Sequence, residues 1–346
     1  MMKKLLLSIF AIAALFSCSK SDITYDNQET QIGFSPVANN ITKSVAGIGT
    51  DGAYDAKFPT TLNLYVFANA QADDLTASWP SSYFQNAKFI YSRLDNGVYE
   101  GDVARFWPNV KSLIFAGYSN ACNIDAIAAN SSVDFSKNEI TITGYTQDNT
   151  KTDKGANDLM WFPWDTKSYT KQNTAVTANM KHACSWITVK VKSDGNYTDL
   201  KLHDLTINGL YHTGNAKCGA TAATWTVSGN ASTENLYLNN DGFTLSTSEV
   251  VFENTANNMI VIPQTPTSID VTYSFVPQTG IAAIKETKPG LSLSIGKETV
   301  NGVEREKLWE SGKHYIYTIT ITATEILIAP EVAEWTNTPV TPGISI

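Results

Sequence analysis

Ile187-Thr188-Val189-Lys190-Val191-Lys192 is the stretch of sequence that decides the fold class. Its three aliphatic residues alternate with one threonine and two lysines, so the apolar side chains fall on one face of an extended strand and the polar ones on the other. A strand of this kind packs one face on a core and exposes the other to water, as in antiparallel sheets.

The same alternation recurs in the second half of the chain, at residues 269–275, 291–295 and 315–322. These segments are rich in valine, isoleucine, threonine and tyrosine, which favour strands. Turn-forming clusters at 193–196 and 239–242 separate them. We therefore predict an all-β protein built from antiparallel β-sandwiches.

The first half is less regular and indicates a second domain. Residues 62–68 and 113–117 are nearly continuous apolar runs, as expected for strands covered on both faces. The polar stretch 145–158 interrupts the strand pattern, and a chain of 346 residues suits two domains. We place the domains at residues 18–170 and 171–346.

Residues 1–17 have the form of a secretory signal. Lys3 and Lys4 precede an apolar run, residues 5–16, which is shorter than the ~20 residues that span a bilayer. Leu15-Phe16-Ser17-Cys18 resembles a bacterial lipobox, in which the cysteine is acylated, for example with palmitate, and becomes the new N-terminus. The alternative is an ordinary cleaved signal with a coincidental cysteine. We predict lipidation at Cys18, because a thioether-linked lipid plus an amide-linked chain anchors more firmly than one acyl chain.

Charge and composition exclude a nucleic-acid-binding protein. Loss of the signal's two lysines lowers the formal net charge from −8 to −10, and arginine occurs only at positions 93, 105 and 305. Such a chain lacks the basic surface that nucleic acids require. Three cysteines remain after position 18, at 122, 184 and 218. They are either small core residues or include a single disulfide, which an oxidising envelope would allow.

No pattern points to a metal, a cofactor or a catalytic group. His182 and Cys184 share one face of a predicted strand, but their spacing to His203, His212 and Cys218 matches no common zinc pattern. No Gly-x-Ser-x-Gly elbow or phosphate loop is present, and the acidic residues are scattered. We predict no metal, no cofactor and no enzymatic activity.

Tryptophans cluster at three places, in residues 161–164 and in the pairs 79–80 and 107–108. Aromatic residues of this kind either pack in the core, where they bury large areas, or form an exposed platform for a sugar. The sequence leaves both interpretations open.

Taken together, the order and spacing of several motifs resemble the fimbrillin-like lipoproteins that build the type V pili of Gram-negative anaerobes. The matching segments span most of the chain after residue 18: Gln31-Ile32-Gly33-Phe34-Ser35-Pro36, Ile41-Thr42-Lys43-Ser44, Leu62–Phe67, Phe106-Trp107-Pro108, Leu113–Tyr118, Asp158-Leu159-Met160, Met180–Val191, Met259–Gln264, Trp309–Tyr317 and Val332–Trp335.

This resemblance implies two tandem transthyretin-like β-sandwich domains and assembly by strand exchange. In the family, a first strand, here about residues 30–36, fills a groove, and Ile32 and Phe34 would be its groove-filling residues. A protease cuts after a basic residue in the following loop, here 41–48, so the cut would fall at Lys43 and Ser44. Family members often have arginine there, and an arginine-specific protease would not cut this lysine, which is otherwise a solvated loop residue.

The resemblance also implies a donor segment and a location. A neighbour's extended segment refills the groove, and in this chain the tail 336–346 could supply Val340, Ile344 and Ile346. Pro339 and Pro342 fit poorly inside a paired strand, so a tip or accessory subunit that donates no strand is an alternative to a stalk subunit. The expected location is the outer membrane and its fimbriae, at the cell surface.

We therefore expect a structural subunit of adhesive fimbriae. Its partners would be other pilin subunits, the outer membrane through the lipid anchor, and the processing protease. The alternative is a surface lipoprotein that does not polymerise and binds a glycan or a host protein.

Overall fold

The computed structural model describes residues 30–38, 63–71, 82–91, 98–108, 112–119, 130–147, 157–164, 174–252, 259–322 and 325–334. In these ranges the chain forms 22 β-strands and no helix, which confirms the predicted all-β class. Consequently, no helix in this part of the chain is long and apolar enough to cross a bilayer.

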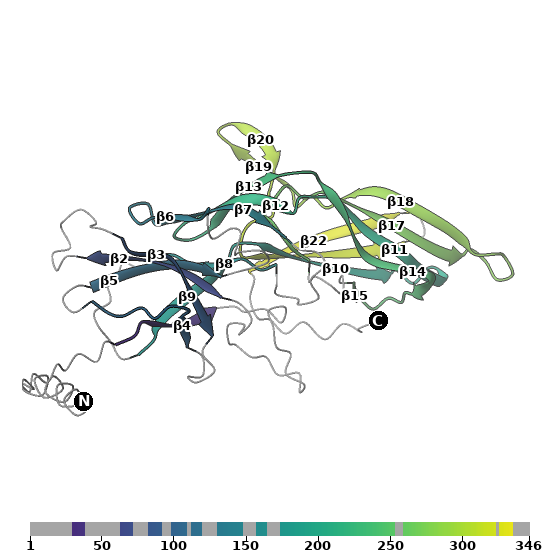
Figure 1. Ribbon diagram of the computed structural model, residues 1–346. Helices are drawn as coiled ribbons and strands as arrows, with labels where there is room; N and C mark the ends of the chain where they lie inside the picture. Colours follow the sequence, from purple (N-terminus) through teal and green to yellow (C-terminus); the bar gives the residue numbers. More distant parts are fainter. Residues whose placement is uncertain are drawn as a thin grey trace, which may run out of the picture.

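Seven strands close into a barrel near the N-terminal end of the molecule (Figure 1). Their order around the barrel is β1 (Gly33–Ala38), β4 (Tyr99–Gly101), β3 (Ser82–Tyr91), β2 (Leu64–Gln71), β5 (Ser112–Ser119), β8 (Met160–Phe162) and β9 (Val176–His182).

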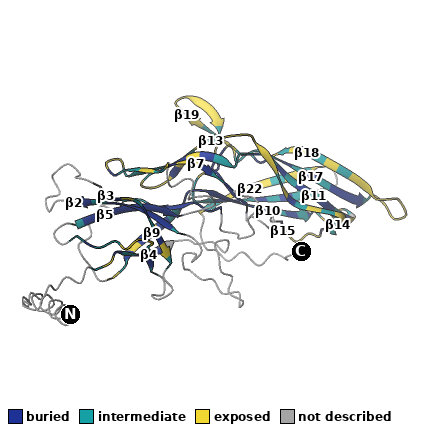
Figure 2. Ribbon diagram, viewed as in Figure 1, coloured by how far each residue is buried: buried dark blue, intermediate teal, exposed yellow. Residues whose placement is uncertain are grey.

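Strands β2 and β5 are buried on both faces, as the nearly continuous apolar runs predicted (Figure 2). Leu64 and Val66 of β2 belong to the core inside the barrel. Tyr65 and Phe67 point to the opposite face and belong to a second core.

A four-stranded sheet covers this second core. Its order is β13 (Ala223–Ser228), β12 (Thr213–Cys218), β7 (Glu139–Thr146) and β6 (Ser132–Asp134). Ile140 and Ile142 of β7 pack with Ala216 and Cys218 of β12 against the outward-facing residues of the barrel strands.

The third core lies between two further sheets, which form a β-sandwich. One sheet has the order β15 (Val250–Phe252), β10 (Ser185–Ser193), β21 (Lys313–Ile321) and β22 (Ile326–Glu334), with β16 (Ile260–Val261) also paired to β10. The other has the order β14 (Ser232–Thr244), β11 (Thr198–Leu210), β17 (Ser268–Val276) and β18 (Ile284–Ser292). The aliphatic residues of the stretch that decided the fold class, Ile187, Val189 and Val191, are fully buried in this core. A separate hairpin, β19 (Lys297–Val300) and β20 (Val303–Glu306), projects from the molecule (Figure 1).

Two strand pairs are parallel, although the alternation of residues predicted antiparallel sheets. β1 runs parallel to β9, and β10 runs parallel to β21. Alternation specifies which face of a strand is buried but not the direction of its neighbour, because both pairings bury the same alternate residues.

Strand pairing also crosses the expected domain boundary at residues 170 and 171. β9 pairs with β8 and β1 in the barrel, and β7 pairs with β12. The boundary itself stays a prediction.

Two consecutive buried hydrogen bonds connect Trp309, Tyr317 and Leu293 in the third core. The indole N–H of Trp309 donates to the hydroxyl of Tyr317 over 2.8 Å, and that hydroxyl donates to the carbonyl of Leu293 over 2.7 Å. Trp309 and Tyr317 are both fully buried. Burial raises the pKa of the Tyr317 hydroxyl far above its ordinary value, so it stays a neutral donor.

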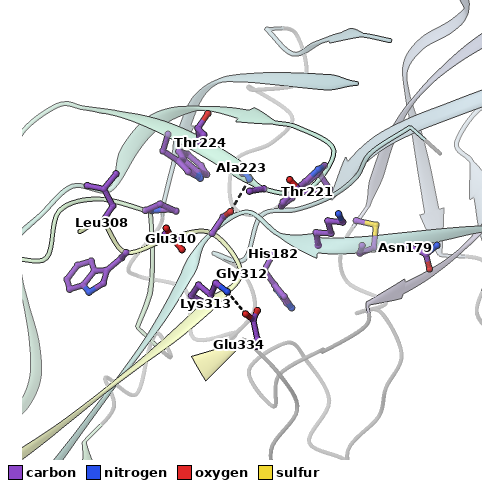
Figure 3. A pocket seen from close by; sticks show the side chains of 18 of the residues that line it. Asn179, His182, Thr221, Ala223, Thr224, Leu308, Glu310, Gly312, Lys313 and Glu334 are labelled. Atoms are coloured by element: carbon purple, nitrogen blue, oxygen red, sulfur yellow. Dashed lines mark hydrogen bonds and ion pairs between the residues drawn. The ribbon is translucent and has the colours of Figure 1, made fainter. Parts of the chain in front are cut away.

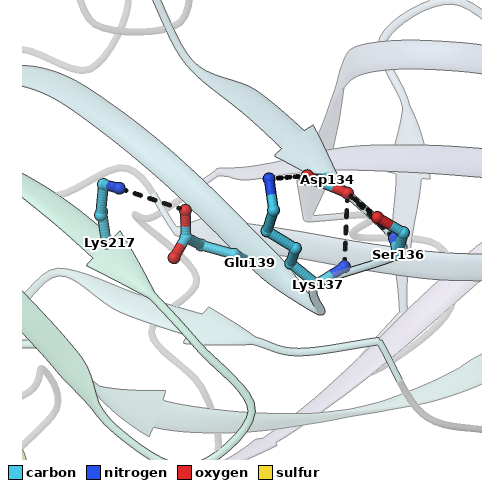
Figure 4. A network of polar contacts seen from close by, with 5 residues as sticks. All are labelled: Asp134, Ser136, Lys137, Glu139 and Lys217. Atoms are coloured by element: carbon cyan, nitrogen blue, oxygen red, sulfur yellow. Dashed lines mark hydrogen bonds and ion pairs between the residues drawn. The ribbon is translucent and has the colours of Figure 1, made fainter.

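A second polar network forms the turn between β6 and β7 (Figure 4). The Asp134 carboxylate accepts hydrogen bonds from the Lys137 ammonium group at 2.7 Å and the Ser136 hydroxyl at 2.6 Å. These bonds stabilise the charged carboxylate and lower the pKa of Asp134 from 3.8 to about 2. Nearby, Lys217 pairs with Glu139 over 3.7 Å.

We expect Tyr317→Phe to lower the free energy of unfolding by about 1–3 kcal/mol, because it leaves the Trp309 N–H and the Leu293 carbonyl without a buried partner. Urea denaturation followed by tryptophan fluorescence measures this change. Tyr83→Phe is the control, because the exposed Tyr83 hydroxyl donates to the Phe106 carbonyl where water can replace it. An equal decrease in the free energy of unfolding in the two variants would contradict a stabilising role for the buried hydrogen bonds of Tyr317.

We expect the Asp134 carboxylate to titrate near pH 2 in the folded protein. Because the folded pKa lies below the ordinary value, the stabilising contribution is complete above the ordinary value and is lost as pH falls through the folded one. Lys137→Met should raise the pKa toward 3.8, whereas Lys217→Met should leave it unchanged. Carbon-detected NMR titration of the carboxyl groups distinguishes the two variants.

Candidate functional site: the seat of the first strand

The first strand closes the barrel by pairing on both of its edges. Toward its start, the Ile32 N–H donates to the Arg105 carbonyl at 2.7 Å and the Trp107 N–H donates to the Thr30 carbonyl at 3.0 Å. In β1 itself, Phe34 lies opposite Tyr99 of β4. From Phe34 to Ala38, the other edge runs parallel to residues 176–180 of β9.

The side chains of this strand fill the middle of the barrel. Ile32 and Phe34 have no exposed surface. The Phe34 ring meets Phe89 and Phe115 edge-on, with ring centroids 4.8 Å and 5.1 Å apart, and lies 6.0 Å from Phe162. Edge-to-face contacts at these distances stabilise beyond the area that they bury.

Gly33 lets the strand approach its neighbour closely. A Cβ atom at this position would lie 2.9 Å from Cγ1 of Val98 and 3.6 Å from the Tyr99 carbonyl oxygen. A larger residue would therefore require the Val98 side chain or the β1 backbone to shift.

The arrangement makes the barrel dependent on β1. Because β1 lies between β4 and β9 in the barrel order, its removal would open the barrel and free the edge of β9 that pairs with β1. It would also expose the core residues around Phe34, which are Phe89, Phe115 and Phe162. Such a groove presents both apolar surface and unpaired backbone groups, which together fit another extended strand.

The remaining predicted site residues lie outside the described residues. These are the lipidation residue Cys18, the processing residues Lys43 and Ser44, and the donor residues Val340, Ile344 and Ile346. Trp79 and Cys122 also lie outside them.

The histidine and cysteine that we considered as metal ligands are core residues. His182 Nδ1 lies 2.7 Å from Oδ2 of Asp158, which is fully buried. Cys184 and Cys218 are buried with free thiols, and burial raises the pKa of both. The part of the chain that the structure describes contains no group of three or more residues placed to hold a metal.

The tryptophans considered as a sugar platform lie mostly inside. Trp107 is buried in the barrel core, and Trp161 is buried in the second core, where its N–H donates to the Gly219 carbonyl at 3.0 Å. Trp164 is partly buried against that same core.

Sequence reasoning missed a cleft of about 700 Å³ between the barrel and the sandwich (Figure 3). Its walls are the end of β9, the turn from β12 to β13, the β19–β20 hairpin and the segment that leads into β21. Arg305 pairs with Glu298 at 2.7 Å, and Lys313 pairs with Glu334. Lys181 and Glu310 also line the cleft, and Lys181 donates to the Ala220 carbonyl at 2.6 Å. No single sequence motif could reveal the cleft, because its walls come from distant segments.

The family model described as fimbrillin-like matches residues 50–335. A fimbrial protein of Bacteroides vulgatus ATCC 8482 is similar in structure with a TM-score of 0.47 at 15% identity, over 88% of this chain and 99% of that chain. The tip fimbrial protein Mfa3 of Porphyromonas gingivalis is similar with a TM-score of 0.43 at 9% identity, over 88% of this chain and 100% of that chain. No curated protein matches the sequence.

We expect Phe34→Ala to lower the free energy of unfolding by about 3–5 kcal/mol, because it leaves a cavity among rings that cannot collapse. The matched control is Ile90→Ala, an exposed residue of β3 in the same barrel, which should cost less than about 1 kcal/mol. Urea unfolding curves of both variants measure the difference. If Phe34→Ala costs no more than Ile90→Ala, β1 does not hold the barrel closed.

Proposed function

The chain belongs to the fimbrillin-like family, and from that premise we propose that it is a structural subunit of surface fimbriae that assembles by exchange of its first strand. The observation that carries this proposal is the way in which β1 is bound in the barrel, between β4 and β9. Phe34 of β1 and Ile32 directly before it are fully buried, and β1 completes a barrel that is otherwise open. The family is one of structural proteins, not enzymes, in agreement with the sequence analysis.

Strand exchange follows from the energetics of such a seat. After β1 leaves, the exposed groove can be refilled by an extended segment of a neighbouring subunit, which restores both the apolar contacts and the backbone hydrogen bonds. A head-to-tail contact of this kind does not close on itself, so repetition produces a filament.

Release of β1 requires a cut in the chain, and we place this cut between Lys43 and Ser44, a few residues after the strand ends. The protease would have to accept lysine. Before the cut, lipid on Cys18 would hold the subunit at the outer membrane.

The donated segment would come from residues 336–346. Ile344 and Ile346 have the same two-residue spacing as Ile32 and Phe34, so both can point into one groove. The strand before this segment, β22, is an edge strand whose Leu327 and Val332 are about half exposed. Its Ile326 and Ile328 still pack against the third core, and all nine of its residues pair with β21.

We expect the protein recovered from sheared surface filaments of its host to start at Ser44 and to carry no lipid. N-terminal sequencing combined with intact mass measures this directly. Lys43→Ala should retain residues 18–43, whereas Lys57→Ala, a control in the following segment, should be processed normally.

A lipidated chain that retains residues 18–43 within filaments would assign an anchoring role instead of a polymerising one. Absence of the protein from the filaments would overturn the fimbrial function.

A further inference from the structure

The edge of β13 that faces the cleft differs from the other free sheet edges in the described part of the chain. Its sequence, Ala223-Thr224-Trp225-Thr226-Val227-Ser228, contains no charge, proline or glycine, and its pairing with β12 has no register shift. Charged residues, prolines, bulges and short length are the features that usually prevent an edge strand from pairing with another chain.

The other edges carry those protections. β18 contains Pro289 and three charged residues, and β22 contains Pro330 and two glutamates. β14 is irregularly paired to β11, both strands of the β19–β20 hairpin are charged, and β6 and β15 have only three residues each.

The free edge of β13 lines the cleft over residues 223–225, and its outward backbone groups have no strand to pair with in the described part of the chain. The Gly219 N–H donates to the Ala222 carbonyl, so residues 222, 224, 226 and 228 face β12, and residues 223, 225 and 227 face outward. The Ala223 N–H agrees with this direction, since it donates to the Ser311 hydroxyl across the cleft at 2.9 Å (Figure 3). Among the described strands β13 pairs only with β12, which leaves the N–H and carbonyl groups of Trp225 and Val227 available.

The edge is also held in place. The Trp225 indole N–H donates to the Ala183 carbonyl at 2.7 Å, and its ring meets Tyr145 at 5.2 Å. Because β13 is already ordered, a strand that pairs with it would not incur the entropy cost of ordering this edge.

We propose that β13 of the uncut subunit is a second strand-accepting site, and that it takes residues 335–346 of a second copy of this chain. The proposal rests on the proposed function in that the same segment is the donated one, and it adds a docking step that needs no removal of β1.

Charge and hydrogen-bonding pattern both favour this occupant. Residues 335–346 contain no charged side chain, which suits the edge of β13, because that strand carries no charge either. Residues 336–341 match the six residues of β13 in length. If Thr338 and Val340 face β13, the Pro339 nitrogen, which has no N–H, points away from the pairing, and Pro342 follows the six paired residues.

The test uses a fluorescent peptide with the sequence of residues 335–346 and the full chain with β1 retained. We expect the peptide to bind, and the Trp225 and Val227 amides to exchange with deuterium at least tenfold more slowly when it is bound. Val227→Pro removes one outward N–H and should weaken binding at least tenfold, whereas Val227→Thr keeps it and should bind as the unchanged chain does.

A second pair of variants keeps the test decisive if Val227→Pro fails to fold. Thr226→Lys places a charge on the exposed face of β13 and should weaken binding at least fivefold. Thr233→Lys, at an exposed threonine of β14, should leave binding unchanged.

Three results would overturn the proposal. Equal binding by Val227→Pro and Val227→Thr would show that β13 does not accept the strand. Amides 225 and 227 already protected without peptide would show that the edge is occupied within one chain. Binding only after a cut at Lys43 would leave the seat of β1 as the acceptor, which supports the proposed function and refutes the docking step.

Discussion

The position of β1 between β4 and β9 is the constraint on which the rest of the N-terminal structure depends. Phe34 fills the space between Phe89, Phe115 and Phe162, and its backbone connects β4, a strand of three residues, to β9. The interior of the barrel is therefore complete only while this strand is seated. Because β2 and β5 present their other face to the second core, the closed barrel also supports the sheet packed outside it.

The proposed exchange of β1 requires that its binding groove accept another strand as well as this one. The stability of the bound strand comes from apolar burial and backbone hydrogen bonds, and neither depends on which polypeptide supplies the strand. The local sequence around β1 shows where the geometry is demanding: Gly33 allows the close approach to Val98, and the residues on either side of it fill the core. A replacement strand must satisfy the same two conditions.

The sheet edges show how the rest of the molecule limits unwanted pairing. Prolines and charged residues protect β18 and β22 against pairing with another strand, and the proposed assembly by strand exchange would need such protection at every edge that should stay unpaired. β13 departs from this pattern, because it contains neither proline nor charge, and its first residues line the cleft. That combination is why we assign it a role in assembly.

Alternating residues determined the all-β class, because a period of two places one face of each strand in a core regardless of what that core contains. The same reasoning identified Ile187, Val189 and Val191 as buried, and the apolar runs as strands covered on both sides. Ile32, directly before β1, and Phe34 within it are fully buried, while the groove-filling role that the family resemblance implied for them remains a proposal.

Only the tertiary structure decided which strands are neighbours. The parallel pairing of β1 with β9, the pairing of β7 with β12 across the expected boundary, the buried contact of His182 with Asp158 and the cleft beside β13 all join residues far apart in sequence. Periodicity reports the environment of a residue along its own strand, whereas strand order and direction depend on the packing of whole sheets.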